Sequence, residues 1–166
     1  LGENKMKSIK SIMAAFTALI MIFALAVPVM ADEITGETVE SVMVEYLEDG
    51  SYYETVITVD ANENGDSGIM STAKTRTGSK KTSYKNKSGA VLWYVKVTGK
   101  FTYNGSTSKC TSASATAASN SSSWKIIDKS SSKSGNKAIG KATAKEQSTS
   151  LTRTVTLSCS KTGKLS

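Results

Sequence analysis

The chain has 166 residues, with 21 Lys or Arg, 14 Asp or Glu and no His, which gives a formal net charge of +7. This length suits one domain. The absence of His removes the commonest general base, the Ser–His and Cys–His nucleophile pairs, and most zinc sites. Composition and charge therefore favour a non-catalytic protein over a hydrolase or a zinc enzyme.

Residues 1–31 have the pattern of a secretory signal peptide. A basic stretch with three lysines precedes an uncharged apolar segment over 12–27, and residues 29–31 fit a small-residue cleavage site. The alternative is an uncleaved membrane anchor, although the apolar segment is shorter than the roughly 20 residues that span a bilayer. We expect a secreted, extracellular product that begins at Asp32 and is released or held at the cell surface by non-covalent contacts.

Charge is divided unevenly along the rest of the chain. Residues 32–66 contain eleven Asp or Glu and no Lys or Arg, whereas residues 67–166 contain eighteen Lys or Arg and two acids, Asp128 and Glu146. Such asymmetry indicates either that the two oppositely charged regions pack together or that the basic region binds a polyanion. The sequence leaves both interpretations open.

Two β-rich runs on either side of Asp49-Gly50 predict a hairpin over 39–59. An Asp-Gly pair between such runs favours a type I′ turn, in which both central residues have positive φ. A two-residue loop would place Glu45 opposite Glu54, an unfavourable pairing of like charges unless lysines relieve it or the register differs. The sequence therefore predicts the hairpin and leaves its register open.

Residues 91–103 form the longest apolar and aromatic run outside the N-terminus and alternate with a period of two, as a strand does. The face expected to be core consists of Val91, Trp93, Val95, Val97, Phe101 and Tyr103. Gly99 interrupts this face and predicts a bulge or the close approach of another strand. We interpret 91–103 as the central strand of an all-β domain, preceded by a segment, 69–84, that is either an edge strand or a loop.

Shorter β-type segments follow at intervals of about ten residues, with turn signals between them. Alternate alanines share one face of the run 106–119, and Cys110 is expected on the other face, although the Ala-rich part is also compatible with a helix. Further strands are predicted at 123–128, 137–147 and 150–160. The predicted fold is a single antiparallel β-sandwich of seven to eight strands over 32–166, with a barrel as the related architecture.

The two cysteines, Cys110 and Cys159, predict a disulfide, because secretion permits oxidation. In the chain-entropy model, a bridge that closes a loop of about 50 residues contributes roughly 4 kcal/mol. The alternative is a pair of buried reduced thiols.

The segment 60–71 is similar to the first half of a calcium loop, which uses oxygen ligands and a sharp turn. The candidate metal ligands are Asp60, Asn62, Asn64 and Asp66. The bidentate Glu expected at the twelfth position is replaced by Ser71. The segment therefore predicts a weak calcium site or, alternatively, a polar turn, and no other cofactor is expected.

Three stretches carry a resemblance to a known group of proteins. They are AVLWYVKVTGKFTYNGSTSKC over 90–110, SWKI and SKSGNKA within 123–138, and TVTLSCSKTGKLS over 154–166. In these stretches the chain resembles an uncharacterised family of small secreted β-rich proteins from Gram-positive, mainly clostridial, bacteria. The resemblance covers most of 84–166; it implies a secreted β-rich fold and carries no functional residues with it.

Lysines near the apolar strand are the candidate anion-binding residues. They are Lys80, Lys81, Lys85, Lys87, Lys96 and Lys100. Secretion argues against nucleic acid, so an anionic cell-wall polymer or a membrane surface is the better match to a positive face. The alternative is a solvated lysine face that serves solubility. Trp93 and Trp124 alternate with core residues and are expected to be buried rather than to stack on sugars.

We therefore expect a non-catalytic binding module at the bacterial cell envelope, with the basic region meeting an anionic polymer. The alternative function is a secreted bacteriocin-like effector that acts on membranes. The hairpin offers carboxylates for glycoside hydrolysis, such as Glu45 and Glu54, but no residue pattern around them predicts a pocket. No catalytic residue is assigned.

Overall fold

The computed structural model describes residues 36–60 and 73–166, which form strands and the turns between them. The strands are β1 (Glu37–Tyr46), β2 (Tyr52–Asp60), β3 (Lys74–Lys85), β4 (Val91–Tyr103), β5 (Ser108–Ser119), β6 (Lys125–Ser134), β7 (Lys137–Glu146) and β8 (Thr149–Ser158). The predicted signal peptide over 1–31 lies outside these ranges. Within them, no helix has the length and hydropathy of a membrane span.

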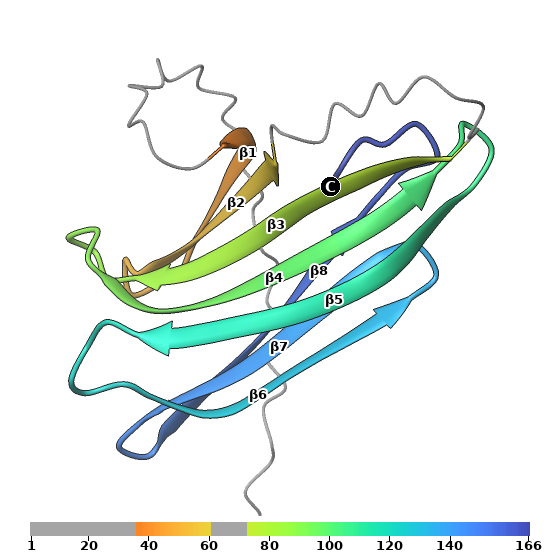
Figure 1. The fold of residues 1–166 in the computed structure, drawn as a ribbon. Coiled ribbons are helices and arrows are strands. Elements are labelled where there is room, and N and C mark those ends of the chain that lie inside the picture. Colours follow the sequence, from red (N-terminus) through yellow and green to blue (C-terminus); the bar gives the residue numbers. More distant parts are fainter. Residues whose placement is uncertain (1–35, 61–72) are drawn as a thin grey trace, which may run out of the picture.

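The strands build two antiparallel sheets. Sheet A has five strands in the order β1-β2-β3-β4-β5, and sheet B has three in the order β6-β7-β8. The sheets lie as two layers, and the chain passes from one to the other between β5 and β6 (Figure 1). The predicted antiparallel β-sandwich of seven to eight strands is therefore confirmed, with eight strands in the described ranges.

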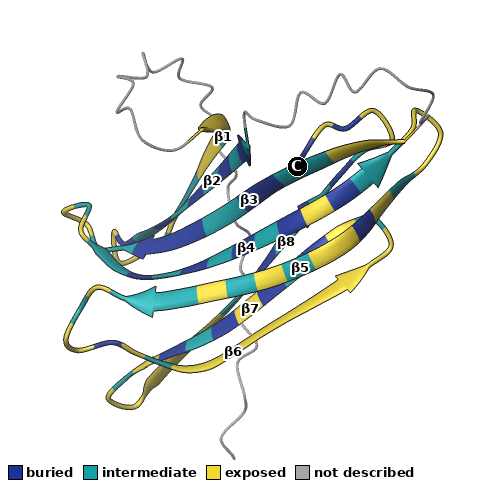
Figure 2. Cartoon of the chain, in the orientation of Figure 1, coloured by how far each residue is buried: buried dark blue, intermediate teal, exposed yellow. Residues whose placement is uncertain are grey.

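The inner face of β4 is the centre of the core, as its alternation predicts. Trp93, Val95, Val97 and Phe101 have at most 1% of their surface exposed. The opposite face of the strand is half-buried or exposed, so burial alternates along β4 (Figure 2). Each Å² of buried apolar surface contributes about 25 cal/mol. Because its buried side chains are large, β4 is the largest single source of hydrophobic stabilisation in sheet A.

The sequence predicts an edge strand or a loop for the segment 69–84, and the structure makes residues 74–84 part of an interior strand. β3 pairs with β2 on one side and with β4 on the other, so it is the middle strand of sheet A. Its inner face is polar in part, because the Thr82 hydroxyl is buried and lies 2.8 Å from that of Thr55 on β2. This hydrogen bond satisfies both buried hydroxyls. Because threonines occupy core positions here, the alternation of apolar and polar residues is weak in the sequence.

Gly99 marks a close approach between the sheets, one of the two predicted explanations. A Cβ at Gly99 would lie 2.8 Å from Cβ of Ala138 on β7 and 2.6 Å from the Phe101 ring. Gly140 on β7 is in a similar position, because a Cβ there would lie 3.0 Å from Cβ of Val97. Two glycines thus allow β4 and β7 to pack at short distance.

A β-bulge changes the face on which Cys110 lies. Lys100 pairs with Ser112, but the next residue of β4, Phe101, pairs with Cys110, so Thr111 is an extra residue in β5. The bulge reverses the alternation at this point. Cys110 consequently shares the inner face with the β5 alanines, and the prediction that it lies on the opposite face is wrong.

The β1–β2 hairpin forms as predicted, with a loop longer than two residues. The Leu47 amide donates to the Ser51 carbonyl at 2.8 Å, and Gly50 has a φ of +81°. Tyr46 therefore pairs with Tyr52, and Glu45 lies opposite Tyr53 instead of Glu54. The longer loop avoids the like-charge pairing that a two-residue loop would impose.

The C-terminal residues close the open side of the sandwich beyond β8. Cys159 and Leu165 form an isolated antiparallel bridge, and Leu165 is 3% exposed. A Cβ at Gly78 of β3 would lie 2.3 Å from a methyl carbon of Leu165. The last residues of the chain therefore pack onto the inner face of sheet A, where sheet B has no further strand.

Candidate functional site

The six predicted anion-binding lysines do not form one site. Lys81, Lys85, Lys96 and Lys100 lie on the outer face of sheet A, which is turned away from sheet B, because they alternate with buried residues of β3 and β4. Lys87 lies in the turn between these strands. Lys80 points to the opposite, inner face. The structure therefore divides the predicted set among three locations.

Two of these lysines are neutralised by the acidic hairpin. The Lys85 ammonium lies 2.7 Å from the Glu54 carboxylate, and the Lys96 ammonium lies 3.6 Å from that of Glu37. The Thr58 hydroxyl donates to the same Glu37 carboxylate at 3.2 Å. These lysines are therefore held by charges of the protein itself.

All four ion pairs of the described ranges join the acidic hairpin to the basic remainder. Besides the two pairs above, they connect Arg76 with Glu40 at 3.9 Å and Arg153 with Glu45 at 2.6 Å. The four acids belong to β1 and β2, and the four bases belong to β3, β4 and β8. Of the two interpretations of the charge asymmetry, internal pairing is therefore confirmed for this part of the basic region.

Lys81 and Lys96 are direct cross-strand neighbours on sheet A, a like-charge pairing that normally destabilises a sheet. Internal contacts offset it, because Lys96 pairs with Glu37 and the Lys81 ammonium lies 4.2 Å from the centroid of the Tyr94 ring. Cation–π contacts of this kind contribute about 0.5–1 kcal/mol at exposed sites. Three of the four lysines on this face therefore already have a contact within the protein.

Lys80 is unusual because it is a lysine on the inner face. It pairs across the sheet with Ile57 on one side and Val97 on the other, both buried. Burial lowers the pKa of Lys80, since the charged ammonium loses hydration there. A position between two apolar neighbours makes Lys80 a poor member of a surface anion-binding site.

A second group of lysines lies on the outer face of sheet B. This face, called here the lysine face, is defined by the exposed residues Lys125, Lys137, Lys141 and Lys145. None of the four has an ion-pair partner in the described ranges. The β6 ribbon is exposed along almost its whole length (Figure 2). Asp128 lies on the same face, opposite Thr143.

The lysine face was not singled out from the sequence, although its signal is present there. Lysines recur at every fourth residue from 137 to 145, which places them on one side of a strand. The residues between them on the other side are buried and small: Ala138, Gly140, Ala142 and Ala144. Small side chains conceal the alternation, because glycine and alanine are weak hydrophobic signals.

Hydroxyl side chains flank the central row of the lysine face on both neighbouring strands. Lys141 lies between Ser130 of β6 and Thr154 of β8, in register across the sheet. Lys137 lies between Ser134 and Ser158, and the Ser158 hydroxyl is already hydrogen-bonded to Ser166. The arrangement offers an ammonium and hydroxyl donors side by side, which suits the oxygen atoms of an anion.

The cysteines do not form the predicted disulfide in the structure. Cys110 and Cys159 are free and buried. Their sulfurs contact separate backbone carbonyls, those of Ser112 at 3.2 Å and Ser160 at 3.4 Å. Burial raises the pKa of both thiols, which keeps them protonated. The structure corresponds to the alternative of two buried reduced thiols.

The predicted calcium loop falls mostly outside the described residues. Asp60 ends β2, whereas Asn62, Asn64 and Asp66 lie in the range 61–72, which is not described. Among residues 36–60 and 73–166, no group of three or more His, Cys, Asp or Glu side chains is arranged to hold a metal ion. The calcium site stays a prediction from the sequence.

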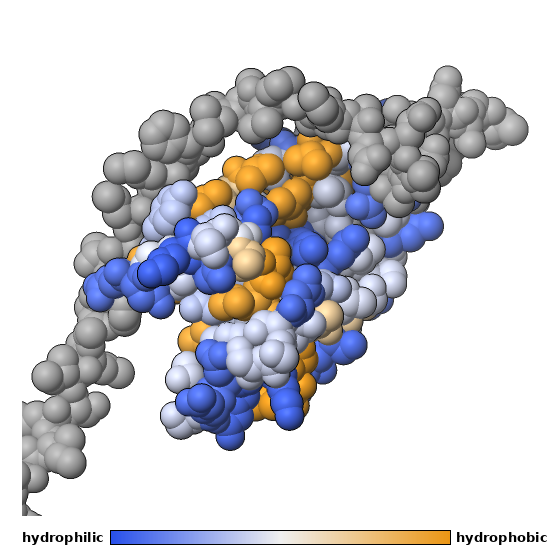
Figure 3. All heavy atoms as spheres, turned by 90° about the vertical axis from the view of Figure 1, so that its left-hand side faces the viewer, coloured by the Kyte–Doolittle hydropathy of each residue, from blue (hydrophilic) through white to orange (hydrophobic). Residues whose placement is uncertain are grey.

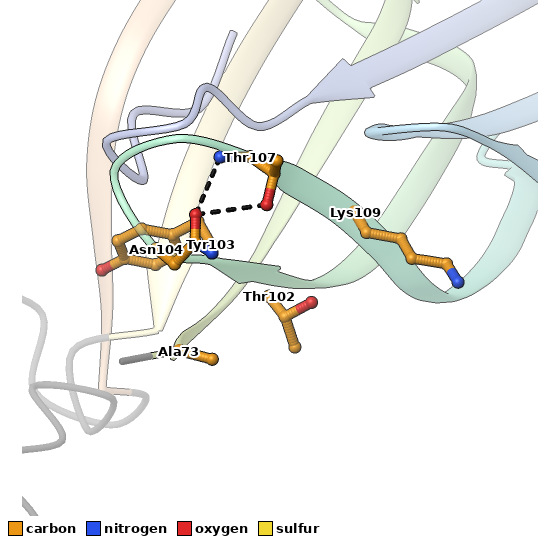
Figure 4. A pocket seen from close by; sticks show the side chains of 6 residues that line it. All are labelled: Ala73, Thr102, Tyr103, Asn104, Thr107 and Lys109. Carbon is orange, nitrogen blue, oxygen red and sulfur yellow. Dashed lines mark hydrogen bonds between the residues drawn. The ribbon is translucent and has the colours of Figure 1, made fainter. Parts of the chain in front are cut away.

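A shallow hollow lies at the turn between β4 and β5. Its cavity volume is about 60 Å³. Figure 4 shows its lining, with the Asn104 side chain accepting hydrogen bonds from the amide and hydroxyl of Thr107 at 2.8 and 3.1 Å. Small-molecule sites usually enclose about 300–1,000 Å³. The hollow is therefore too small and too open to define a substrate pocket.

The two tryptophans are buried, as predicted. Trp93 is 1% and Trp124 is 5% exposed, and they belong to an aromatic cluster with Tyr53 and Tyr84.

Large apolar side chains are exposed mainly on β1: Val39, Val42, Met43 and Tyr46. Figure 3, which looks at the side where β1 lies, shows apolar atoms among hydrophilic ones near the top of the described part.

The fold and its charge distribution define a β-sandwich with one cationic sheet face. Comparison of the chain with protein-family models, with curated proteins and with solved structures found no match. The family resemblance of 90–110, 123–138 and 154–166 stays a prediction from the sequence.

Proposed function

We propose that this protein is a secreted, non-catalytic binding module of the bacterial cell envelope, whose lysine face binds an anionic cell-wall polymer. One observation carries the proposal. The hairpin glutamates pair with bases of β3, β4 and β8, whereas the four lysines of the outer face of sheet B have no such partner. The signal-peptide pattern supports an extracellular location.

The register of sheet B supports binding over mere solubility. Lys125 and Lys145 are direct cross-strand partners, and both are exposed. Like charges in this position destabilise a sheet by a few tenths of a kcal/mol or more. On sheet A the corresponding pair, Lys81 and Lys96, is offset by Glu37 and Tyr94. A bound polyanion would give Lys125 and Lys145 the compensation that the chain itself does not supply.

The alternative, a bacteriocin-like effector acting on membranes, is less well supported. Only two larger apolar residues lie at the lysine face: Ile139, which is partly exposed, and Ile127 at the β6 bulge, which is 57% exposed. The apolar side chains exposed on β1 share that strand with Glu37, Glu40 and Glu45, which repel an anionic lipid surface. Neither surface combines lysines with the broad apolar area that insertion into a bilayer requires.

The test compares two variants that lose the same charge. One carries Lys125→Gln, Lys141→Gln and Lys145→Gln on the lysine face; the control carries Lys87→Gln, Lys100→Gln and Lys109→Gln at exposed positions elsewhere. Binding to purified Gram-positive cell walls is measured across a salt series. Each lost lysine contact is expected to reduce the slope of log K against log salt by about 1. The control should keep the wild-type slope.

The same proteins are added to dye-filled vesicles of anionic lipid. Wall binding that depends on the lysine face, without dye release, supports the proposal. Equal losses in both variants, or no wall binding at low salt, would reject it. Release of dye from the vesicles, together with failure of intact cells to retain the protein, would favour the membrane-effector function.

A further inference from the structure

We infer that the lysine face accommodates a linear polymer of polyol phosphodiesters, lying along β7. This inference rests on the proposed function and narrows its ligand. It depends on three properties of the face: the spacing of the lysines, the kind of donors that surround them, and the side chains that the face does not contain.

The central lysines form a straight, regularly spaced row. Lys137, Lys141 and Lys145 are four residues apart on one strand, so they stand about 13–14 Å apart at a rise of about 3.4 Å per residue. Three covalent bonds of an extended chain span about 3.3–3.6 Å, so a repeat unit with six backbone bonds spans about 7 Å. A three-carbon polyol phosphodiester has six such bonds. Every second phosphate therefore meets a lysine of β7.

The donors of the face suit the oxygens of a phosphate. Arginine binds both carboxylates and phosphates through two parallel hydrogen bonds, whereas lysine binds phosphate as a point charge. Both described arginines, Arg76 and Arg153, already contact glutamates of the hairpin. The lysine face has ammonium groups with hydroxyls on either side, such as Ser130 and Thr154 around Lys141. A tetrahedral phosphodiester presents two free oxygens, which reach the ammonium and one flanking hydroxyl together.

The face also lacks the groups that nucleic-acid binding uses. Single-stranded nucleic acids bind by stacking their bases on aromatic side chains, each stack contributing about 1–3 kcal/mol. The exposed side chains of the described sheet B are lysines, hydroxyl residues, Asp128 and Ile127, with Ile139 partly exposed and no aromatic residue among them. A phosphodiester polymer without bases, rich in hydroxyls, matches this surface.

The experiment measures the affinity of the full protein for three probes of equal charge: synthetic poly(glycerol phosphate), polygalacturonate and oligothymidylate. The expected result is binding of poly(glycerol phosphate) at least 10-fold tighter than of the other two. A second measurement uses the double variant Lys141→Thr with Thr154→Lys, which keeps the net charge and moves one ammonium sideways to the neighbouring strand. This variant should bind poly(glycerol phosphate) about 5-fold more weakly.

The outcomes separate this inference from the proposed function. Equal affinities for the phosphate and carboxylate polymers, both lost on charge removal from the lysine face, would overturn the phosphodiester inference and leave the proposed function standing. An unchanged affinity of the double variant would overturn the alignment along β7. Absence of binding to all three probes and to cell walls would overturn both. Circular dichroism of each variant checks that the sheet is intact.

Discussion

The guanidinium of Arg153 lies 2.6 Å from the carboxylate of Glu45 and joins β8, an edge strand of sheet B, to β1, an edge strand of sheet A. The two residues are 108 positions apart in the chain. The same guanidinium lies 4.3 Å from the centroid of the Tyr53 ring. Burial raises the pKa of Tyr53, and the Arg153 charge partly opposes this rise. One side chain thus connects the acidic hairpin, the aromatic core and the second sheet.

We expect Arg153→Gln to lower the free energy of unfolding by about 1 kcal/mol, from a partly exposed ion pair and a cation–π contact. Arg153→Lys keeps the charge and should lower the free energy of unfolding by about half as much. Part of the stabilisation is still lost, because lysine has no planar guanidinium to stack on the Tyr53 ring. A double-mutant cycle with Glu45→Gln, followed by urea denaturation, measures the coupling. A coupling energy of zero would show that the pair contributes nothing to stability.

Gly99→Ala should destabilise the protein by about 2–3 kcal/mol, because its methyl group would overlap the Phe101 ring and the Ala138 side chain in a packed core. Gly140→Ala should cost less, since the nearest atom, Cβ of Val97, would be 3.0 Å away. The control is Gly135→Asn, at a position with φ +55° and no atom within 4 Å of a Cβ. Equal melting temperatures for all three variants would contradict the close approach of β4 and β7.

Both cysteines should resist thiol reagents in the native protein. Because burial raises the pKa of Cys110 and Cys159, their thiols ionise at higher pH than an exposed cysteine and remain protonated near pH 8. A colourimetric thiol assay should detect two thiols after denaturation and almost none before it. Fewer than two thiols in the denatured, unreduced protein would show that a bridge forms after all.

Lys80→Met should raise the free energy of unfolding at pH 7 by about 1 kcal/mol, a typical size for a single substitution. The folded state lowers the pKa of Lys80, so the native protein binds this proton less readily than the unfolded chain does. The cost of the charged lysine is therefore present at neutral pH and declines as the pH rises through the folded pKa towards 10.5. The advantage of the variant should shrink between pH 7 and pH 10.

Urea melts of the wild-type protein and Lys80→Met at both pH values provide the measurement. Lys100→Met, on the exposed outer face, serves as the control and should change stability by less than about 0.5 kcal/mol at either pH. Destabilisation by Lys80→Met at pH 7 would mean that the ammonium has a favourable interaction in the fold.

Local pattern was sufficient where a strand is regular and its buried residues are large. The alternation of 91–103 predicted the buried face of β4, and the same rule located β8. It failed where a bulge shifts the pattern by one residue, as at Thr111, and where Ser and Thr face the core, as along β3. On β7 it located the strand but not the row of lysines along it. Bulges depend on the partner strand, which local pattern does not contain.

The sequence by itself determined the all-β class, most of the strands, and the separation of an acidic from a basic region. Only the tertiary structure decided which basic residues the acids neutralise, because each ion pair joins residues distant in the chain, such as Glu37 with Lys96 and Glu45 with Arg153. The Coulomb interaction between two charges depends on their distance in space and not on their separation in the sequence. Which lysines of sheet B the acids leave unpaired is therefore known only once the two sheets have packed.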